Sequence, residues 1–104
     1  MSILLQIDFP YPGPWGEEMS AAMRELAESI AGEPGLQWKI WTENPSTGEA
    51  GGIYLFADQA SAENYLTMHC ARLASFGIHD IRSKLFSINT ELSLLDRAPL
   101  GVQS

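Results

Sequence analysis

A hairpin pattern in the middle of the chain is the feature that most constrains the fold. Residues 36–43 (LQWKIWTE) and residues 52–56 (GIYLF) are rich in β-branched and aromatic side chains, which favour strands. The segment NPSTG between them consists of residues that favour turns. We therefore predict two neighbouring antiparallel strands here, and the rest of the fold has to be arranged around this pair.

One strand and one helix are predicted on each side of the hairpin. Alternating apolar residues predict a strand over residues 3–9, and apolar residues at helical spacing predict a helix from Glu17 to about Gly32. A second helix begins at Asp58 or Ser61 and ends at Gly77, and its apolar stripe includes Phe76. A strand over residues 81–89 follows. The order βαββαβ predicts an α+β fold, a four-stranded antiparallel sheet with both helices on one face.

The other face of this sheet is expected to be covered as well. The third and fourth strands have apolar residues on both sides, whereas a strand with one face in water should alternate cleanly. These residues are Ile53, Tyr54, Leu55 and Phe56 in the third strand, and Ile81, Leu85, Phe86 and Ile88 in the fourth. We predict a homodimer that joins two sheets face to face. Residues 1–104 are expected to form one domain, with residues 90–104 as a C-terminal tail that makes a short helix or an arm on the neighbour.

Composition excludes several partners. The formal net charge is −7, and the six Lys and Arg residues are scattered, so neither nucleic acid nor a membrane surface is an expected partner. No segment approaches the roughly 20 apolar residues of a membrane-spanning helix. Cys70 is the single cysteine, which excludes an internal disulfide and suits a reducing compartment. We expect a cytoplasmic protein.

Three segments carry a family resemblance: EPGLQWKIWTEN at residues 33–44, EAGGIYLF at residues 49–56 and HCARL at residues 69–73. Together with ILLQIDF and GPWG near the start, they resemble the YdhR-type mono-oxygenase family from residue 3 to about residue 95. The resemblance implies a dimeric ferredoxin-like α+β barrel with a pocket between sheet and helices. It also implies membership in a superfamily whose oxygenases attack polycyclic aromatic substrates without metal or flavin. Haem-degrading relatives use an Asn where this first strand has Gln6 and Asp8, which argues against haem.

His69 is the candidate for acid–base chemistry. An imidazole can exchange a proton near neutral pH, and the helical position of His69 points it toward the sheet. The alternative is a core histidine held by a hydrogen bond. Arg72 is expected to pair with an acid, and His79 is expected at the surface. Two histidines without matching carboxylate spacing do not indicate a metal site, so no metal or other cofactor is expected.

Four aromatic residues are candidates for substrate binding. Trp38 and Trp41 should point to opposite faces of their strand unless a bulge intervenes, so one would line a pocket and the other would pack at the dimer interface. Tyr54 and Tyr65 would add polar tips to an apolar cavity. Plain core or interface packing is the alternative for each. Gly51 and Gly52 precede a strand, which indicates a bulge or a close backbone approach rather than a phosphate loop.

Two functions fit these residues. The first is a cofactor-independent mono-oxygenase that acts on a small electron-rich aromatic molecule, such as a phenol, a quinol or an anthrone-like ring. In this hypothesis His69 removes a proton, and the substrate anion then reacts with dioxygen. The second is a non-catalytic dimer that binds or senses a small apolar ligand, which is favoured by the lack of a recognisable dyad, triad or metal cluster.

Overall fold

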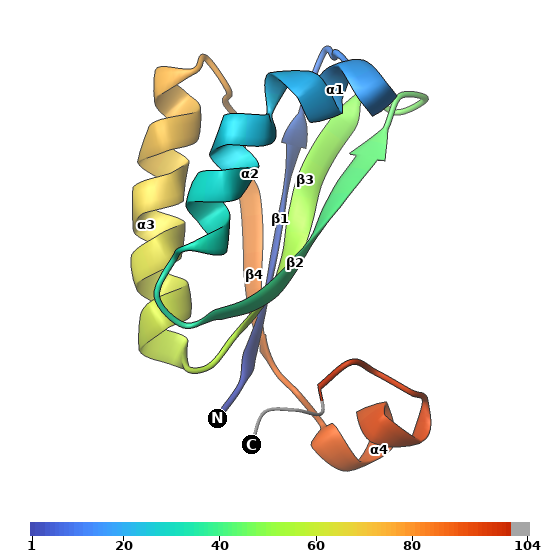
Figure 1. Cartoon of the computed structure of the whole chain (residues 1–104), viewed down its shortest axis with the longest axis vertical. Coiled ribbons are helices and arrows are strands. Elements are labelled where there is room, and N and C mark those ends of the chain that lie inside the picture. The colour runs from blue at the N-terminus through green and yellow to red at the C-terminus, as the bar shows by residue number, and fades with distance from the viewer. Residues whose placement is uncertain (101–104) are drawn as a thin grey trace.

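The computed structural model describes residues 1–100 of the chain as an α+β fold (Figure 1). The elements are β1 (Ile3–Pro10), α1 (Gly16–Ala22), α2 (Arg24–Ala31), β2 (Leu36–Asn44), β3 (Glu49–Phe56), α3 (Gln59–Ser75), β4 (Arg82–Ser87) and α4 (Thr90–Leu95). The strands form one antiparallel sheet in the order β2-β3-β1-β4. This confirms the predicted ferredoxin-like sheet with its βαββαβ order.

One face of the sheet is covered by α1, α2 and α3 (Figure 1). Along β1, Ile3, Leu5, Ile7 and Phe9 are buried, and the residues between them are half-buried. The strand register places Tyr54 and Phe56 of β3 opposite Leu5 and Ile3, so they share the same face. This side of the sheet therefore provides the hydrophobic core.

The ends of the helices follow local rules, with one departure from the prediction. The Asp58 carboxylate accepts a hydrogen bond from the Ser61 backbone N–H at 2.8 Å and caps α3, and Gly77 takes a positive φ just after this helix. The first predicted helix is divided into α1 and α2 at Met23. No Gly or Pro marks this position. The division turns α1 across one end of the sheet while α2 runs along it (Figure 1).

The opposite face, which we call the open face, changes character along the strands. One row across the sheet is apolar and consists of Trp38, Leu55, Leu4 and Phe86. The next row contains Ile40, Ile53, Gln6 and Lys84, and the third contains Thr42, Gly51, Asp8 and Arg82. No helix covers this face within residues 1–100, and Ile40 and Phe86 remain about half exposed at 52% and 43%.

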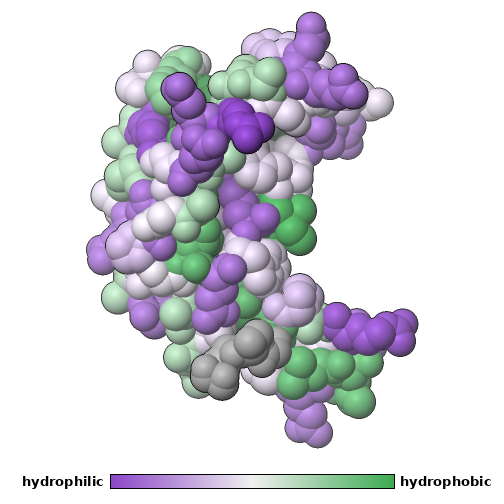
Figure 2. All heavy atoms as spheres, viewed as in Figure 1, coloured by the Kyte–Doolittle hydropathy of each residue, from purple (hydrophilic) through white to green (hydrophobic). Residues whose placement is uncertain are grey.

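Helix α4 stands apart from the body of the molecule (Figure 1). Leu92, Leu94 and Leu95 on this helix are exposed, and apolar side chains lie on this projecting part in Figure 2. The predicted tail therefore forms a short helix over part of its length, and its last four residues, 101–104, lie outside the described residues. Phe76 was expected in the buried stripe but is 58% exposed, because it is the C-cap of α3, where the helical periodicity ends.

Among residues 1–100, none of the helices is long and apolar enough to cross a membrane.

Candidate active site

A buried aromatic cluster lies between the sheet and α3. Tyr54 reaches it from β3, whereas Tyr65 and His69 reach it from successive turns of α3. All three side chains are at most 3% exposed. Residues four apart on a helix share a face, so α3 directs both of its rings onto the sheet. Three of the predicted site residues are thus brought together.

The rings of this cluster are in direct contact. The Tyr65 hydroxyl donates a hydrogen bond to the Tyr54 hydroxyl at 3.2 Å. The Tyr65 and His69 rings are stacked with centroids 4.9 Å apart, and the Tyr54 ring meets His69 edge-on at 6.5 Å. Burial raises the pKa of Tyr65 to about 12 and raises that of Tyr54 further. Both phenols are therefore protonated hydrogen-bond donors at neutral pH.

The guanidinium of Arg72 fixes the protonation state of His69. Its Nε and Nη2 atoms lie 3.3 Å and 3.0 Å from His69 Nδ1. Because a guanidinium can only donate, Nδ1 accepts and the proton of the neutral ring is on Nε2. Burial, followed by the charges of Lys39 and Arg72, lowers the pKa of His69 to about 3. In this arrangement His69 offers an Nε2–H donor, and its predicted role as a base remains a prediction.

The prediction that Arg72 pairs with an acidic residue was wrong. Arg72 contacts the imidazole of His69, and in the described part of the chain no carboxylate forms an ion pair with it. The two residues are three apart on α3, which places them side by side. This spacing is visible in the sequence, but an acid was the expected partner because ion pairs are the usual contacts of arginine.

The two tryptophans lie on opposite faces of β2, as predicted. The register of β2 against β3 shifts between Leu36 and Trp38, so the irregularity precedes both indoles. Trp41 is opposite Gly52 on the helix side and lines the interior cavity. Trp38 is opposite Leu55 on the open face, and its Nε1–H donates to the Pro99 carbonyl at 2.9 Å. Of these two tryptophans, Trp41 lines the interior cavity, whereas Trp38 borders the groove between α2 and β2.

Lys39 is the site residue that sequence reasoning missed. Its side chain crosses β3 on the helix side, and its Nζ lies 3.5 Å from the centroid of the Trp41 ring and 4.7 Å from that of Tyr54. Burial, followed by the charge of Arg72, lowers the pKa of Lys39 to about 7. The signal was present in WKIW, because Lys39 is two residues before Trp41 and so shares its face.

Two glycines allow this packing. A Cβ atom on Gly52 would lie 2.6 Å from Lys39 Cε, so the lysine side chain passes directly over this glycine and would have to shift if a side chain were added there. A Cβ on Gly51 would lie 2.0 Å from the Ile7 carbonyl oxygen. The predicted close backbone approach at this pair is confirmed, and the β-bulge alternative is not observed at either position.

The interior cavity is small and mostly apolar. Its volume is about 30 Å³, and Lys39, Trp41, Tyr54 and His69 are among its lining residues. Two shallow grooves lie beside it on the helix side. One of about 300 Å³ is lined by Met19, Met23 and Trp41, and one of about 260 Å³ by Ile30, Lys39 and Trp41, among others. The Trp41 indole borders all three spaces.

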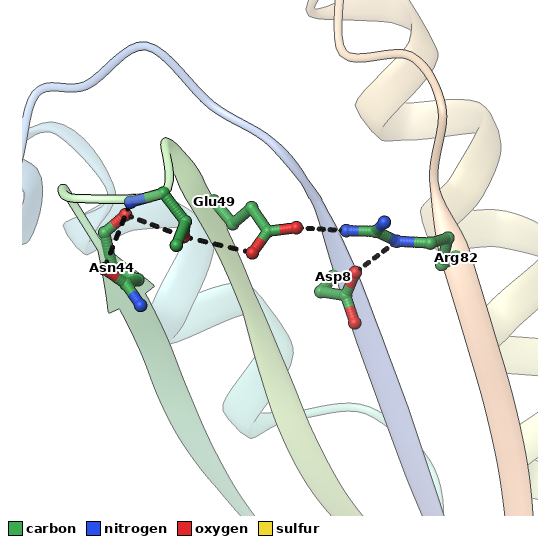
Figure 3. Close-up of polar contacts among 5 residues, drawn as sticks. Asp8, Asn44, Glu49 and Arg82 are labelled. Atoms are coloured by element: carbon green, nitrogen blue, oxygen red, sulfur yellow. Dashed lines mark hydrogen bonds and ion pairs between the residues drawn. The ribbon is translucent and has the colours of Figure 1, made fainter.

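A larger hollow of about 470 Å³ lies on the open face and is lined mainly by polar residues, of which Asp8, Glu49 and Arg82 are paired with one another. Arg82 donates from Nε to Asp8 at 2.6 Å and from Nη2 to Glu49, as Figure 3 shows. The Thr47 hydroxyl donates to the same Glu49 carboxylate at 3.0 Å. A ligand site usually combines an apolar lining with a few convergent polar groups, so the interior cavity is the better candidate.

Metal-binding chemistry has no candidate ligand set in the described residues. No group of three His, Cys, Asp or Glu side chains among residues 1–100 is placed to hold a metal ion. The exposed His79 is separate from the buried cluster around His69.

Comparisons with known proteins concern the family and the fold of the chain. The model of the family described as "Putative mono-oxygenase ydhR" matches residues 4–99. Among curated protein sequences, none matches the chain significantly. The fold is similar to that of a mutant of SnoaB, a cofactor-independent oxygenase from Streptomyces nogalater, with a TM-score of 0.60 and 14% identity over 85% of this chain and 93% of that one. It is also similar to a structure described as a putative antibiotic biosynthesis monooxygenase from Deinococcus radiodurans, with a TM-score of 0.56 and 15% identity over 86% and 93% of the two chains.

Proposed function

Because the chain belongs to the ydhR mono-oxygenase family, we propose that it is a cofactor-independent mono-oxygenase of a small electron-rich aromatic molecule. The substrate is a phenol, a quinol or an anthrone-like ring, bound between the sheet and the helices. The observation that supports this site is the buried cluster of Tyr54, Tyr65 and His69 beside an apolar cavity. SnoaB, which shares the fold, is described as a cofactor-independent oxygenase.

The chemistry requires the protein to supply deprotonation and water exclusion, while the substrate supplies the electrons. Loss of a proton gives an electron-rich anion, which transfers one electron to dioxygen. The two radicals combine to a peroxide anion, which takes up the released proton to form a hydroperoxide. Loss of water then leaves a ketone, with one oxygen atom in the product and the other in water. Buried donors that face the developing oxyanion lower the barrier to its formation. Because Arg72 occupies Nδ1, the Nε2–H of His69 remains available to act as such a donor in this proposal.

Substrate entry requires movement of Trp41. The interior cavity of about 30 Å³ has room for roughly one water molecule, whereas an aromatic ring needs several times that volume. The grooves of about 300 Å³ and 260 Å³ both border Trp41, and β2 is an edge strand. Rotation of the indole would join these spaces at the edge of the sheet. Trp41 is therefore both a wall of the proposed site and its entrance.

The proposed enzyme is a cytoplasmic homodimer joined through the open face. In the apolar row of this face Leu55 is already buried, but Phe86 is 43% exposed and Trp38 and Leu4 are half-buried, so a second copy can cover these three side chains. The exposed leucines of α4 extend the apolar surface available to a partner. Trp38 belongs to this interface rather than to the substrate site.

A binding or sensing protein is the second candidate. It is favoured by the low pKa of His69, about 3, which leaves no charge change on this ring near neutral pH, and by the closed cavity. Native mass spectrometry of freshly purified protein separates the two functions. A retained, unmodified aromatic ligand without oxygen uptake supports binding alone.

The enzyme proposal is tested by oxygen consumption with anthrone and with hydroquinones. We expect one molecule of dioxygen to be consumed for each anthrone whose methylene group becomes a ketone, which gives the quinone. With ¹⁸O₂, one labelled oxygen atom should appear in this product. His69→Ala should lower kcat/KM about 10²-fold, the effect of removing one oxyanion donor. His79→Ala is the matched control, because His79 is exposed and separate from the site. Absence of oxygen uptake across this substrate series would contradict the proposal.

A further inference from the structure

Lys39 is a basic group inside the site whose role the family resemblance does not supply. Its Nζ lies 3.5 Å above the centre of the Trp41 ring and 4.7 Å from the centre of the Tyr54 ring. Lys39 and His69 line the same cavity from opposite layers, the lysine from the sheet and the histidine from α3. A ring bound between these layers would have both residues within reach.

Apart from the two aromatic rings, the surroundings of Lys39 disfavour its charged form. Over residues 1–100, Lys39 forms no ion pair with a carboxylate, and no hydrogen-bond acceptor contacts its amine. The positive charge of Arg72 acts on it from α3. The titratable and charged groups that face it are Tyr54 from β3, His69 and Arg72 from α3, and Tyr11 from the loop after β1. The segment of α1 and α2 contributes only uncharged residues, namely Met19, Leu26 and, between the two helices, Met23.

We propose that Lys39 is the catalytic base: its neutral amine takes the proton from the substrate while the Nε2–H of His69 holds the resulting oxyanion. This inference rests on the proposed mono-oxygenase function and assigns its proton-transfer step. This assignment narrows the substrate class. The substrate must carry an acidic C–H or O–H group on the side that faces Lys39 and an oxygen atom on the side that faces His69. Anthrone and hydroquinones meet this requirement.

Both protonation states of Lys39 are accommodated. Its pKa of about 7 leaves a large fraction of the amine neutral at neutral pH. Once protonated, the ammonium lies over the faces of Trp41 and Tyr54, which attract a cation. Lys39, Ile30 and Leu36 also border the groove of about 260 Å³ on the helix side. This groove provides a path for the proton to solvent.

The proposed step balances with dioxygen as the only co-reactant. For anthrone, Lys39 removes one proton from the methylene carbon, and the carbanion loses one electron to dioxygen. Combination of the carbon radical with superoxide forms the C–O bond of a peroxide, which Lys39 or solvent protonates. Removal of the second methylene proton breaks the O–O bond, giving the ketone and hydroxide, which is protonated to water.

An anaerobic experiment isolates this step. Anthrone is mixed with the protein without oxygen, and the long-wavelength absorbance of its enolate is recorded. We expect the wild type to form the enolate near neutral pH, and Lys39→Met to form at least tenfold less at equal bound anthrone. Lys39→Arg is the second variant, because it keeps the positive charge but cannot accept a proton. Circular dichroism confirms that each variant is folded.

The outcomes separate the two proposals. Equal enolate in wild type and Lys39→Met, or none in a wild type that binds anthrone, would overturn the role of Lys39. Enolate that depends on Lys39 but gives no ketone when oxygen is admitted supports the base and contradicts the oxygenase function.

An independent readout uses the fact that the chain has two lysines, Lys39 and Lys84. After reductive ¹³C-methylation, the lysine signal that Lys39→Met removes should titrate with a midpoint near the Lys39 pKa of about 7. A Lys39 signal that remains protonated to pH 9 would overturn the proposal. In steady-state assays kcat/KM should rise with pH through the same midpoint, and this rise should be absent in Lys39→Met.

Discussion

The two faces of the sheet are built from the same alternation of side chains but end in different environments. On the helix-covered face Leu5 and Phe56 are fully buried, and a polar cluster around His69 is enclosed with them. On the open face Phe86 is 43% exposed, and the ion pairs of Arg82 are in contact with solvent. The first face is completed within one chain. The second is apolar at one end and charged at the other, so it has the features of a surface that receives a partner.

The largest expected difference between the faces is in folding stability. Phe56→Ala removes a fully buried ring and should lower the free energy of unfolding by about 3–5 kcal/mol. Phe86→Ala, its matched control on the open face, should cost clearly less at a protein concentration where the chain is monomeric. Urea denaturation of both variants measures the difference. Equal losses at every concentration would show that the open face is as well packed as the core.

The next effect is the response of the covered face to acid. The pKa of His69 is about 3 in the folded protein and 6.5 in the reference state, so between these values the unfolded chain binds a proton that the folded chain does not. Stability therefore falls as the pH falls from about 6.5 toward 3, and this residue contributes on the order of a few kcal/mol.

The variant His69→Gln removes the group that binds this proton in the unfolded chain. It keeps a neutral side chain that Arg72 can contact. We expect the stability of the variant to change less than that of the wild type between pH 6.5 and 3, measured by urea denaturation at several pH values. His79→Gln is the control on the surface. If the wild type and His69→Gln lost stability in parallel, the imidazole would not be held neutral by the fold.

The covered face was also the more predictable of the two. Period-two alternation in β1, helical spacing in α3 and the turn at residues 44–48 determine the order of elements, because each is a local signal. The division of the first helix at Met23 was not predictable, because no Gly or Pro lies at this position and its place depends on packing over the sheet.

The candidate site was predicted in part. The positions of Tyr54, Tyr65 and His69 follow from periodicity, so they were found. Lys39 was missed because a lysine in a strand is usually solvated, whereas this one is half-buried and passes over Gly52 in the neighbouring strand. Arg72 could have contacted either His69 or an acidic residue, and sequence spacing alone does not decide between these partners.

A smaller effect is expected from a charge on the open face. Phe86→Glu places a carboxylate in the apolar row, where a homodimer would bring two copies of the charge into one interface. We expect the dimer dissociation constant to rise at least tenfold, which is about 1.4 kcal/mol. Phe76→Glu is the control, because Phe76 is exposed at the end of α3, on the other side of the sheet. Sedimentation at micromolar concentration measures both variants, and a wild type that is monomeric there would contradict the dimer.

The smallest effect concerns the ion pairs of Arg82 with Asp8 and Glu49. Hydrogen bonds from Arg82 and Thr47 lower the pKa of Glu49 below its ordinary value of 4.5, so this stabilisation is present above that value and is lost as the pH falls through the lowered pKa. In a monomer these groups are exposed and screened, and Arg82→Gln should change stability little, as should the control Arg24→Gln at the exposed pair with Glu28.

A homodimer changes this expectation for Arg82 alone. If a second copy covers the open face, the Arg82 pairs lose contact with water, and removal of one partner leaves buried charge unpaired. The cost of Arg82→Gln should then grow with protein concentration, whereas the cost of Arg24→Gln should not. Urea denaturation at two concentrations a hundredfold apart decides between these cases. An Arg82 effect independent of concentration would mean that the charged end of the open face lies outside the dimer interface.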